Sequence, residues 1–249
     1  QATDFIDVGT KRAGYNINTG HPVADGILNA VLNGLSDGNI DLSTWNKLTF
    51  SYPSCLLGCV TTGTTAGSIT FESNTVNFNR DLLVGNGSVV VNASTINLDG
   101  KISGKLSGSD VILNATRLSS NSGLVNVISN NALIQQGLDF VVSNGTVNVG
   151  AGTYDEDLTM SKSGVTLNGA KSGVAGDDVS RGVGETIITP HSPGIVITAD
   201  NATVDGVVID GADYAIYVDN ADNVVLKNNI LTNSSIHGIY AVGSAGLDI

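Results

Sequence analysis

The residues best suited to chemistry are an acidic pair and a nearby arginine in one glycine-rich segment. Asp177 and Asp178 precede Arg181 in G-V-A-G-D-D-V-S-R-G-V-G. Paired carboxylates are what glycoside hydrolysis requires as acid and base, and a long loop leaving a repetitive scaffold commonly carries its function. We therefore predict Asp177, Asp178 and Arg181 as a binding site.

The partner groups that catalysis would need are missing from the sequence. Lyase chemistry on uronates needs a base beside a neutralised carboxylate, yet Lys227 is the only basic residue in the last three repeats. No H-E-x-x-H motif occurs, and His21, His191 and His237 stand far apart. We predict no catalytic residue, no metal site and no cofactor, with calcium as the one alternative.

Several aspartates of the C-terminal half stand within two residues of glycine or asparagine, the residues of turns. We interpret them as solvated corner residues, with a contribution to a calcium or sugar site as the alternative: Asp205, Asp210, Asp213, Asp219 and Asp222. We likewise interpret His237 as a corner or flanking residue. The cysteines Cys55 and Cys59 stand in S-C-L-L-G-C, where they form either a local disulfide, which we predict, or two buried thiols.

These residues are positioned by repeats. G-S-I-T-F-E-S-N-T-V-N-F-N begins at Gly67, G-S-V-V-V-N-A-S-T-I-N-L-D at Gly87 and G-S-D-V-I-L-N-A-T-R-L at Gly108. The three starts are almost evenly spaced along the chain. Each copy holds short apolar strands separated by polar corners, so we predict three successive coils of one repeat.

A second set of repeats fills the C-terminal half. Ile187-Ile188 corresponds to Val208-Ile209 and then to Ile230-Leu231, at nearly the same spacing as the first set. The next strand recurs as Ile195-Val196-Ile197, Ile216-Tyr217-Val218 and Ile239-Tyr240-Ala241. This alignment predicts that Tyr217 and Tyr240 stack across coils, a structural ladder in preference to a sugar platform, and that Tyr214 joins them at a surface.

Short Val- and Ile-rich strands at a period of about 20–22 residues indicate an all-β fold, a parallel β-helix. One coil cannot bury its inward side chains, whereas stacked coils create a continuous core. Asn suits the corners because it tolerates the left-handed conformation and bonds to its counterpart in the next coil. A β-sandwich is the alternative, but it would not require a fixed period.

Two segments depart from the repeat. In residues 130–142 the apolar positions predict one short helix, with Asn130 as its N-cap, that lies against the solenoid or plugs its end. Residues 1–66 show no period, so we predict an irregular N-terminal capping region. The predicted domains are 1–66, a capping region, 67–128, a first run of coils, and 129–249, a second run that continues beyond the chain.

The stretch from Ala132 through A-G-T-Y-D-E-D-L resembles the opening of the pectin-lyase-like superfamily, and residues 219–240 resemble its coil repeat. This resemblance implies a right-handed β-helix and specifies activity poorly. Residues 67–128 are similar to the β-helical repeats of filamentous-haemagglutinin-type adhesins. That similarity implies a bacterial surface protein, with a surface polysaccharide or a host or neighbour-cell receptor as partner.

Composition and charge exclude several classes. The net charge is −12 and the 11 basic residues are scattered, which disfavours a nucleic acid partner. No apolar run is long enough for a membrane span. We therefore expect an extracellular or cell-surface structural or adhesive module of a larger protein, which is not an enzyme. The alternatives are a carbohydrate-active enzyme or polysaccharide-binding passenger, and a subunit that self-associates into a surface layer or filament.

Overall fold

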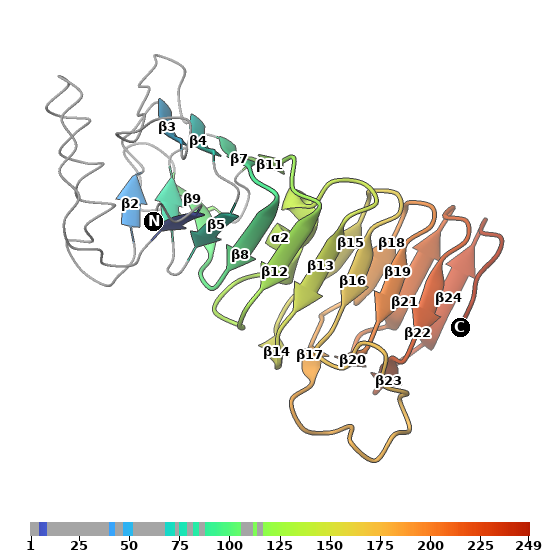
Figure 1. The fold of residues 1–249 in the computed structure, drawn as a ribbon. Coiled ribbons are helices and arrows are strands. Elements are labelled where there is room, and N and C mark those ends of the chain that lie inside the picture. Colours follow the sequence, from blue (N-terminus) through green and yellow to red (C-terminus); the bar gives the residue numbers. More distant parts are fainter. Residues whose placement is uncertain are drawn as a thin grey trace, which may run out of the picture. The chain divides into compact units, whose positions relative to one another are not determined.

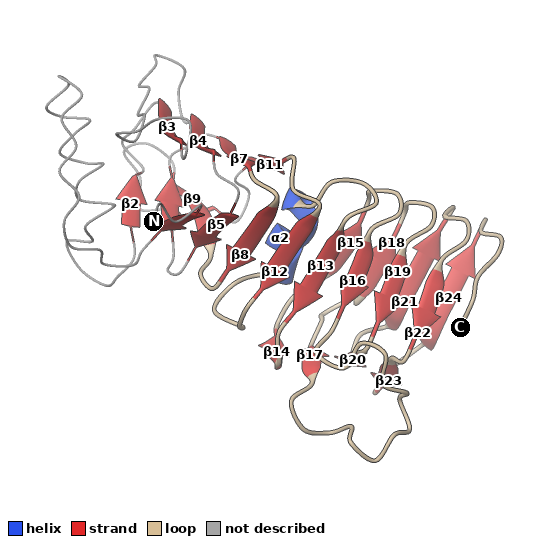
Figure 2. Cartoon of the chain, in the orientation of Figure 1, coloured by secondary structure: helices blue, strands red, loops and turns tan. Residues whose placement is uncertain are grey.

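The computed structural model describes residues 5–8, 40–42, 47–51, 68–72, 75–78, 82–84, 88–105, 112–113 and 117–249. The chain divides into two compact units, residues 1–122 and 123–249. The described elements are short β-strands and one helix, which confirms the all-β class (Figure 2). Cys55 and Cys59 lie outside the described residues.

In the first unit, strands separated by one repeat pair in parallel. Thr75 pairs with Thr95, and Ser68 pairs with Ser88, the equivalent residues of the next repeat. Three strands from residues 1–66 extend the same ladders. The strands are β1 (Phe5–Val8), β5 (Thr75–Phe78) and β8 (Thr95–Leu98); β2 (Ile40–Leu42), β6 (Leu82–Val84), β9 (Ile102–Lys105) and β10 (Ile112–Leu113); and β3 (Lys47–Ser51), β4 (Ser68–Glu72), β7 (Ser88–Asn92) and β11 (Arg117–Ser120).

The repeat predicted from Gly108 is wrong in its register. Its apolar residues Ile112 and Leu113 form β10, which pairs antiparallel with β9. The place beside β7 is taken by β11, in which Leu118 pairs with Val89, further along the chain than one repeat would place it. The segment G-S-D-V-I-L has the sequence pattern of the start of a coil, but the strand that pairs with β7 is β11, which comes later in the chain.

The second unit contains three parallel sheets, named here sheets A, B and C (Figure 1). From β13 onward the chain visits them in the order A, B, C and then begins again, which is compatible with a parallel β-helix. Sheet A contains β12 (Leu124–Val127), β13 (Thr146–Val149), β16 (Thr166–Asn168), β19 (Thr203–Asp205) and β22 (Val225–Lys227); sheet B contains β14 (Gly152–Tyr154), β17 (Thr186–Ile188), β20 (Val207–Asp210) and β23 (Ile230–Thr232); sheet C contains β15 (Leu158–Met160), β18 (Ile195–Ile197), β21 (Tyr214–Asp219) and β24 (His237–Val242).

The register predicted for the C-terminal repeats is confirmed. In sheet B, Ile187 pairs with Val208, which pairs with Ile230. In sheet C, Val196 pairs with Tyr217, which pairs with Tyr240. The repeat length read from the sequence is therefore the length of chain between a residue and its neighbour in the next strand of the same sheet.

Inward side chains from the sheets build a continuous apolar core. In sheet A, Val147, Leu167, Val204 and Leu226 follow one another in register and are at most 3% exposed. In sheet C, Ile195 and Ile216 are fully buried in the same way. Each fully buried side chain of this size contributes about 1.5–3 kcal/mol relative to exposure. The alternation of inward apolar and outward polar residues thus fixes which face each strand presents.

The one helix described, α2 (Ile134–Phe140), is shorter than predicted, and its N-cap is Leu133 instead of Asn130. Its N-terminal amides are bonded by a distant carboxylate: Glu156 accepts hydrogen bonds from Ile134 N at 2.7 Å and Gln135 N at 3.1 Å. At the other end, Lys162 Nζ donates to three carbonyls, with distances of 2.5–3.0 Å. Both charges suit the helix dipole. Glu156 is the glutamate of the A-G-T-Y-D-E motif.

Asparagines bond from coil to coil, at the corners between Asn223 Nδ2 and Asn201 Oδ1 at 3.5 Å, and also within the strands of sheet A, where such bonds were not predicted. In the second unit, Asn168 Nδ2 donates to Asn148 Oδ1 at 3.1 Å, and Asn148 Nδ2 donates to Asn126 Oδ1 at 3.0 Å. Positive φ values occur at Asn144, Asn201 and further corner asparagines. Among the described residues, no helix is both long and apolar enough to cross a membrane.

Candidate functional site

The predicted site residues lie on the loop of residues 169–185, which joins β16 to β17 and is the long tan loop in Figure 2. Thr146 pairs with Thr166, one ordinary repeat later, whereas Thr166 pairs with Thr203, after a much longer stretch of chain. The loop supplies the extra chain in that one coil. A long insertion of this kind is a common location for binding groups.

Arg181 holds the base of this loop. Its Nε and Nη2 donate to both carboxylate oxygens of Glu185 at 2.7 and 3.0 Å, and Nη1 donates to the carbonyls of Val174 and Asn228. The side chains of Arg181 and Glu185 are each only 4% exposed. Burial raises the pKa of Glu185, but the bonds from Arg181 and Gly182 outweigh it, so this pKa lies below its usual range. The guanidinium is committed to anchoring the loop.

Asp177 and Asp178 are both exposed. Asp178 Oδ1 accepts a hydrogen bond from Ser180 N at 2.8 Å, and the bonds with Ser180 lower the pKa of Asp178. The Arg181 guanidinium instead donates its hydrogen bonds to Glu185 and to two backbone carbonyls. The structure therefore places the three predicted residues on one loop, where Arg181 N donates to the carbonyl of Asp178 at 3.0 Å, but among these described residues no hydrogen bond joins their side chains in one site.

Asp205, predicted as a solvated corner residue, is instead a buried strand residue that fastens the other end of this loop. Its side chain accepts hydrogen bonds from Ser172 Oγ at 2.7 Å, Gly173 N at 3.1 Å and Asn228 Nδ2 at 2.7 Å, and Lys227 Nζ lies 3.6 Å away. Burial raises its pKa, but these bonds prevail and the pKa is lowered. Asp205 is thus a structural carboxylate.

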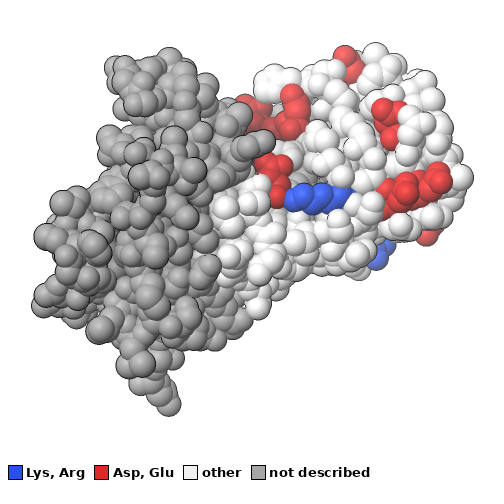
Figure 3. All heavy atoms as spheres, turned by 90° about the horizontal axis from the view of Figure 1, so that it is seen from above, with Lys and Arg blue, Asp and Glu red and all other residues white. Residues whose placement is uncertain are grey.

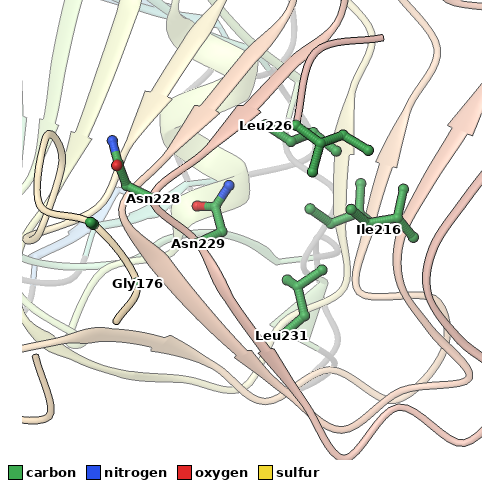
Figure 4. Close-up of a pocket in the computed structure, with 9 residues that line it drawn as sticks. Gly176, Ile216, Leu226, Asn228, Asn229 and Leu231 are labelled. Carbon is green, nitrogen blue, oxygen red and sulfur yellow. The ribbon is translucent and has the colours of Figure 1, made fainter. Parts of the chain in front are cut away.

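A cavity of about 310 Å³ lies inside the last strands of the second unit. In Figure 4, Ile216, Leu226 and Leu231 meet in an apolar wall. Both asparagines of the lining use their side-chain amides within the protein: Asn229 Nδ2 donates to Val204 O and its Oδ1 accepts from Val207 N, and Asn228 Nδ2 donates to Asp205 Oδ1. The cavity is consequently an extension of the apolar core and offers little to a polar ligand.

The outward face of sheet C carries an aromatic cluster, defined as Tyr214, Tyr217, His237 and Tyr240. Tyr217 and Tyr240 stack with ring centroids 5.6 Å apart and an interplanar angle of 16°, and His237 stacks on Tyr240 at 5.7 Å and 9°. Tyr214 is tilted by 39–44° to the other three rings. The predicted Tyr217–Tyr240 ladder is confirmed, and the cluster spans two adjacent strands, β21 and β24.

Two carboxylates flank the aromatic cluster. Asp213 precedes Tyr214 and accepts hydrogen bonds from Ser192 Oγ at 3.0 Å and Ser235 Oγ at 2.7 Å, which lower its pKa. Asp219 ends β21 on the same side as Tyr217. Desolvation, followed by the charge of Asp219, raises the pKa of Tyr217, so its hydroxyl stays protonated near neutral pH. The cluster is therefore an aromatic surface that lies between two carboxylates.

Sequence reasoning missed the place of His237 in this cluster, although the signal was present. Tyr214 pairs with His237 in register, and Tyr217 pairs with Tyr240, so the same length of chain separates the members of both pairs. In a stack of coils, the residue that follows an outward tyrosine by one repeat of the sequence lies beside it in the neighbouring strand. The prediction of His237 as a corner or flanking residue needs that correction: it is the first residue of β24.

Charged side chains are sparse on the face shown in Figure 3, and most of those visible in the described part are acidic. Within the described residues, no group of three or more His, Cys, Asp or Glu side chains is arranged to hold a metal ion. In comparisons with known proteins, no family model, no curated protein and no solved structure matched the chain.

Proposed function

We propose that this chain is a right-handed parallel β-helix, similar to those of the pectin-lyase-like superfamily, that serves as a structural and adhesive module of an extracellular or cell-surface bacterial protein. The parallel ladders and their repeated sheet order support the fold, and the helix capped by Glu156 of the A-G-T-Y-D-E motif fits the same superfamily. The resemblance of residues 67–128 to adhesin repeats supports the surface location.

The observation that carries this proposal is that polar side chains of the second unit form hydrogen bonds within the protein, between coils and between a coil and its inserted elements. Asn126, Asn148 and Asn168 bond to one another across three strands. Lys162 and Glu185 are occupied by helix carbonyls and by Arg181. These groups join one coil to the next or fasten the elements between them, which is what a shaft needs to resist unfolding.

Binding of a polysaccharide is the second candidate function, and the aromatic cluster favours it. Aromatic rings flanked by hydrogen-bonding groups are surfaces that sugars can contact through their apolar faces. Such binding is compatible with the adhesive role, because an adhesive module requires a surface that contacts a partner.

Adhesion and turnover can be tested together with the purified chain. Beads coated with the chain are passed under flow over immobilised neutral glucan, polygalacturonate or glucosamine polymer, and the solution is analysed for released oligosaccharides. We expect retention on at least one polymer without release of fragments. Retention on none would refute the adhesive role.

The predicted acidic pair provides the control for catalysis. If fragments are released by the natural chain but not by the Asp177→Ala/Asp178→Ala variant, the chain is an enzyme and the structural role is wrong. Both residues are exposed, so the variant is expected to fold normally.

A further inference from the structure

We infer that the aromatic cluster on sheet C is a binding surface for an amino-sugar polysaccharide, whose sugar rings contact Tyr217 and Tyr240 while its ammonium groups are attracted by Asp213 and Asp219. The inference rests on the proposed adhesive function and names the class of partner. It combines two independent observations, an exposed group of rings and the negative charge at both of its ends.

The rings are exposed in a chain that has few of them. Only 5% of residues are aromatic, yet three of the six tyrosines gather in this cluster. Tyr240 is 40% exposed, and Tyr214 and Tyr217 are half-buried. A structural ladder inside the core would bury such rings. On the outward face they leave apolar surface in contact with water, which a ligand can cover.

The backbone holds these rings in place. Ser235 Oγ and the amides of Ile236 and His237 all bond to Asp213, the amides through its carbonyl oxygen at 3.0 Å. The paired registers of β21 and β24 fix Tyr217 beside Tyr240. A site whose side chains are already ordered loses little entropy when a ligand binds.

The geometry fits a chain of sugar rings. Along β21, the ring centroids of Tyr214 and Tyr217 are 6.1 Å apart, roughly the length of one pyranose unit, and Tyr240 stacks beside Tyr217 on the neighbouring strand at 5.6 Å. From Tyr214 to Asp219 strand β21 runs for about 17 Å at the usual rise per residue, and Asp213 immediately precedes the strand. An oligosaccharide of several units can therefore lie over the rings and reach the carboxylates.

The charges select the class of sugar. Bonds from two serines keep the pKa of Asp213 low, and the chain as a whole carries a net charge of −12. Uronate polymers are repelled by this surface, whereas protonated amines gain attraction to the carboxylates and to the tyrosine rings. An amino-sugar polymer is the one common polysaccharide chemistry that uses both the apolar and the negative groups.

The test measures binding of three hexamers to the purified full chain by calorimetry, at mildly acidic pH so that free amines are protonated. We expect the glucosamine hexamer to bind at least about fivefold more tightly than the N-acetylglucosamine hexamer, and hexagalacturonate not to bind. Tyr217→Leu or Tyr240→Leu should weaken binding of the glucosamine hexamer by about fivefold or more. The Phe variants keep the ring and should bind as the natural chain does.

Matched variants separate a site from general attraction to an acidic protein. Asp219→Asn should reduce the preference for the free amine, whereas Asp177→Asn, an exposed charge on the loop, should not. Any one of three results would overturn the inference. The Asp219→Asn and Asp177→Asn variants could change the preference for the free amine equally, the Leu variants could bind as the natural chain does, or the glucosamine hexamer could fail to bind. If coated beads adhere to a polymer while the Leu variants bind normally, the adhesive function stands and this site is wrong.

Discussion

Removal of the Arg181 guanidinium is expected to destabilise the second unit strongly. In Arg181→Met, Glu185 keeps the hydrogen bond from Gly182 N but loses both bonds from the guanidinium, and its side chain is only 4% exposed in the natural chain. The carbonyls of Val174 and Asn228 lose a donor in the same variant. The substitution therefore leaves a buried negative charge that is only partly satisfied.

The expected magnitude follows from this burial. Breaking a buried ion pair by removing one partner costs about 3–5 kcal/mol of unfolding free energy, whereas an exposed pair contributes about 0–1 kcal/mol. Replacing both partners by apolar residues removes the unpaired charge. We therefore expect Arg181→Met/Glu185→Met to recover most of the stability lost in the single variant.

Urea unfolding followed by far-ultraviolet circular dichroism measures the free energies of the natural chain, both single variants and the double variant. Hydrogen exchange at the amides of Gly173 and Gly182 reports whether the loop has detached, because both amides bond to anchoring carboxylates. A loss below about 1 kcal/mol in Arg181→Met, with unchanged exchange, would refute the reasoning, since that is the value of a solvated pair.

Three further predictions concern the second unit. Glu156→Gln weakens the bonds to the helix amides and should cost about 1–2 kcal/mol of unfolding free energy, measured by urea unfolding. The control is Asp155→Asn: the Asp155 carboxylate lies 3.8 Å from His191 Nδ1 and both side chains are exposed, so this variant should cost under about 0.5 kcal/mol. Gly206 has φ +74° and no room for a Cβ beside Ser172 N, so Gly206→Ala should cost about 1–3 kcal/mol more than Gly173→Ala, where φ is +79° and the space is open. Because the fold lowers the pKa of Asp205, its stabilisation is present above the ordinary value of about 3.9 and is lost as pH falls through the lower folded value. An acid titration of stability should therefore be flatter for Asp205→Asn; an unchanged acid limb would contradict this assignment.

The sequence by itself determined the ladders in which spacing is regular. Where Ile187, Val208 and Ile230 recur at one coil's length, the buried alternation allows only one register, since a slip of one residue would turn the apolar side chains outward. The stacking of Tyr217 on Tyr240 follows from the same spacing. The same rule would have placed His237 beside Tyr214.

Only the tertiary structure decided the contacts between residues that the repeat does not relate. The segment at Gly108 satisfies the repeat pattern, but β11 competes for the place beside β7 and occupies it. Helix α2 is capped by Glu156, which follows it by a full coil of chain, so its first turn could not be inferred from Asn130. Local pattern describes what a segment favours, whereas long-range partners decide between equally suitable segments.

In the candidate site, too, some features could be predicted from the sequence and others depended on the tertiary structure. Asp177, Asp178 and Arg181 are close in sequence, and the sequence alone could not show that the Arg181 guanidinium bonds with Glu185 instead of the two aspartate side chains. Asp205 likewise resembles a corner residue until the loop folds over it. The sequence determined which residues repeat along the stack, because strand pairing is periodic; folding of the inserted loop determined which charges are buried, because desolvation depends on what covers them.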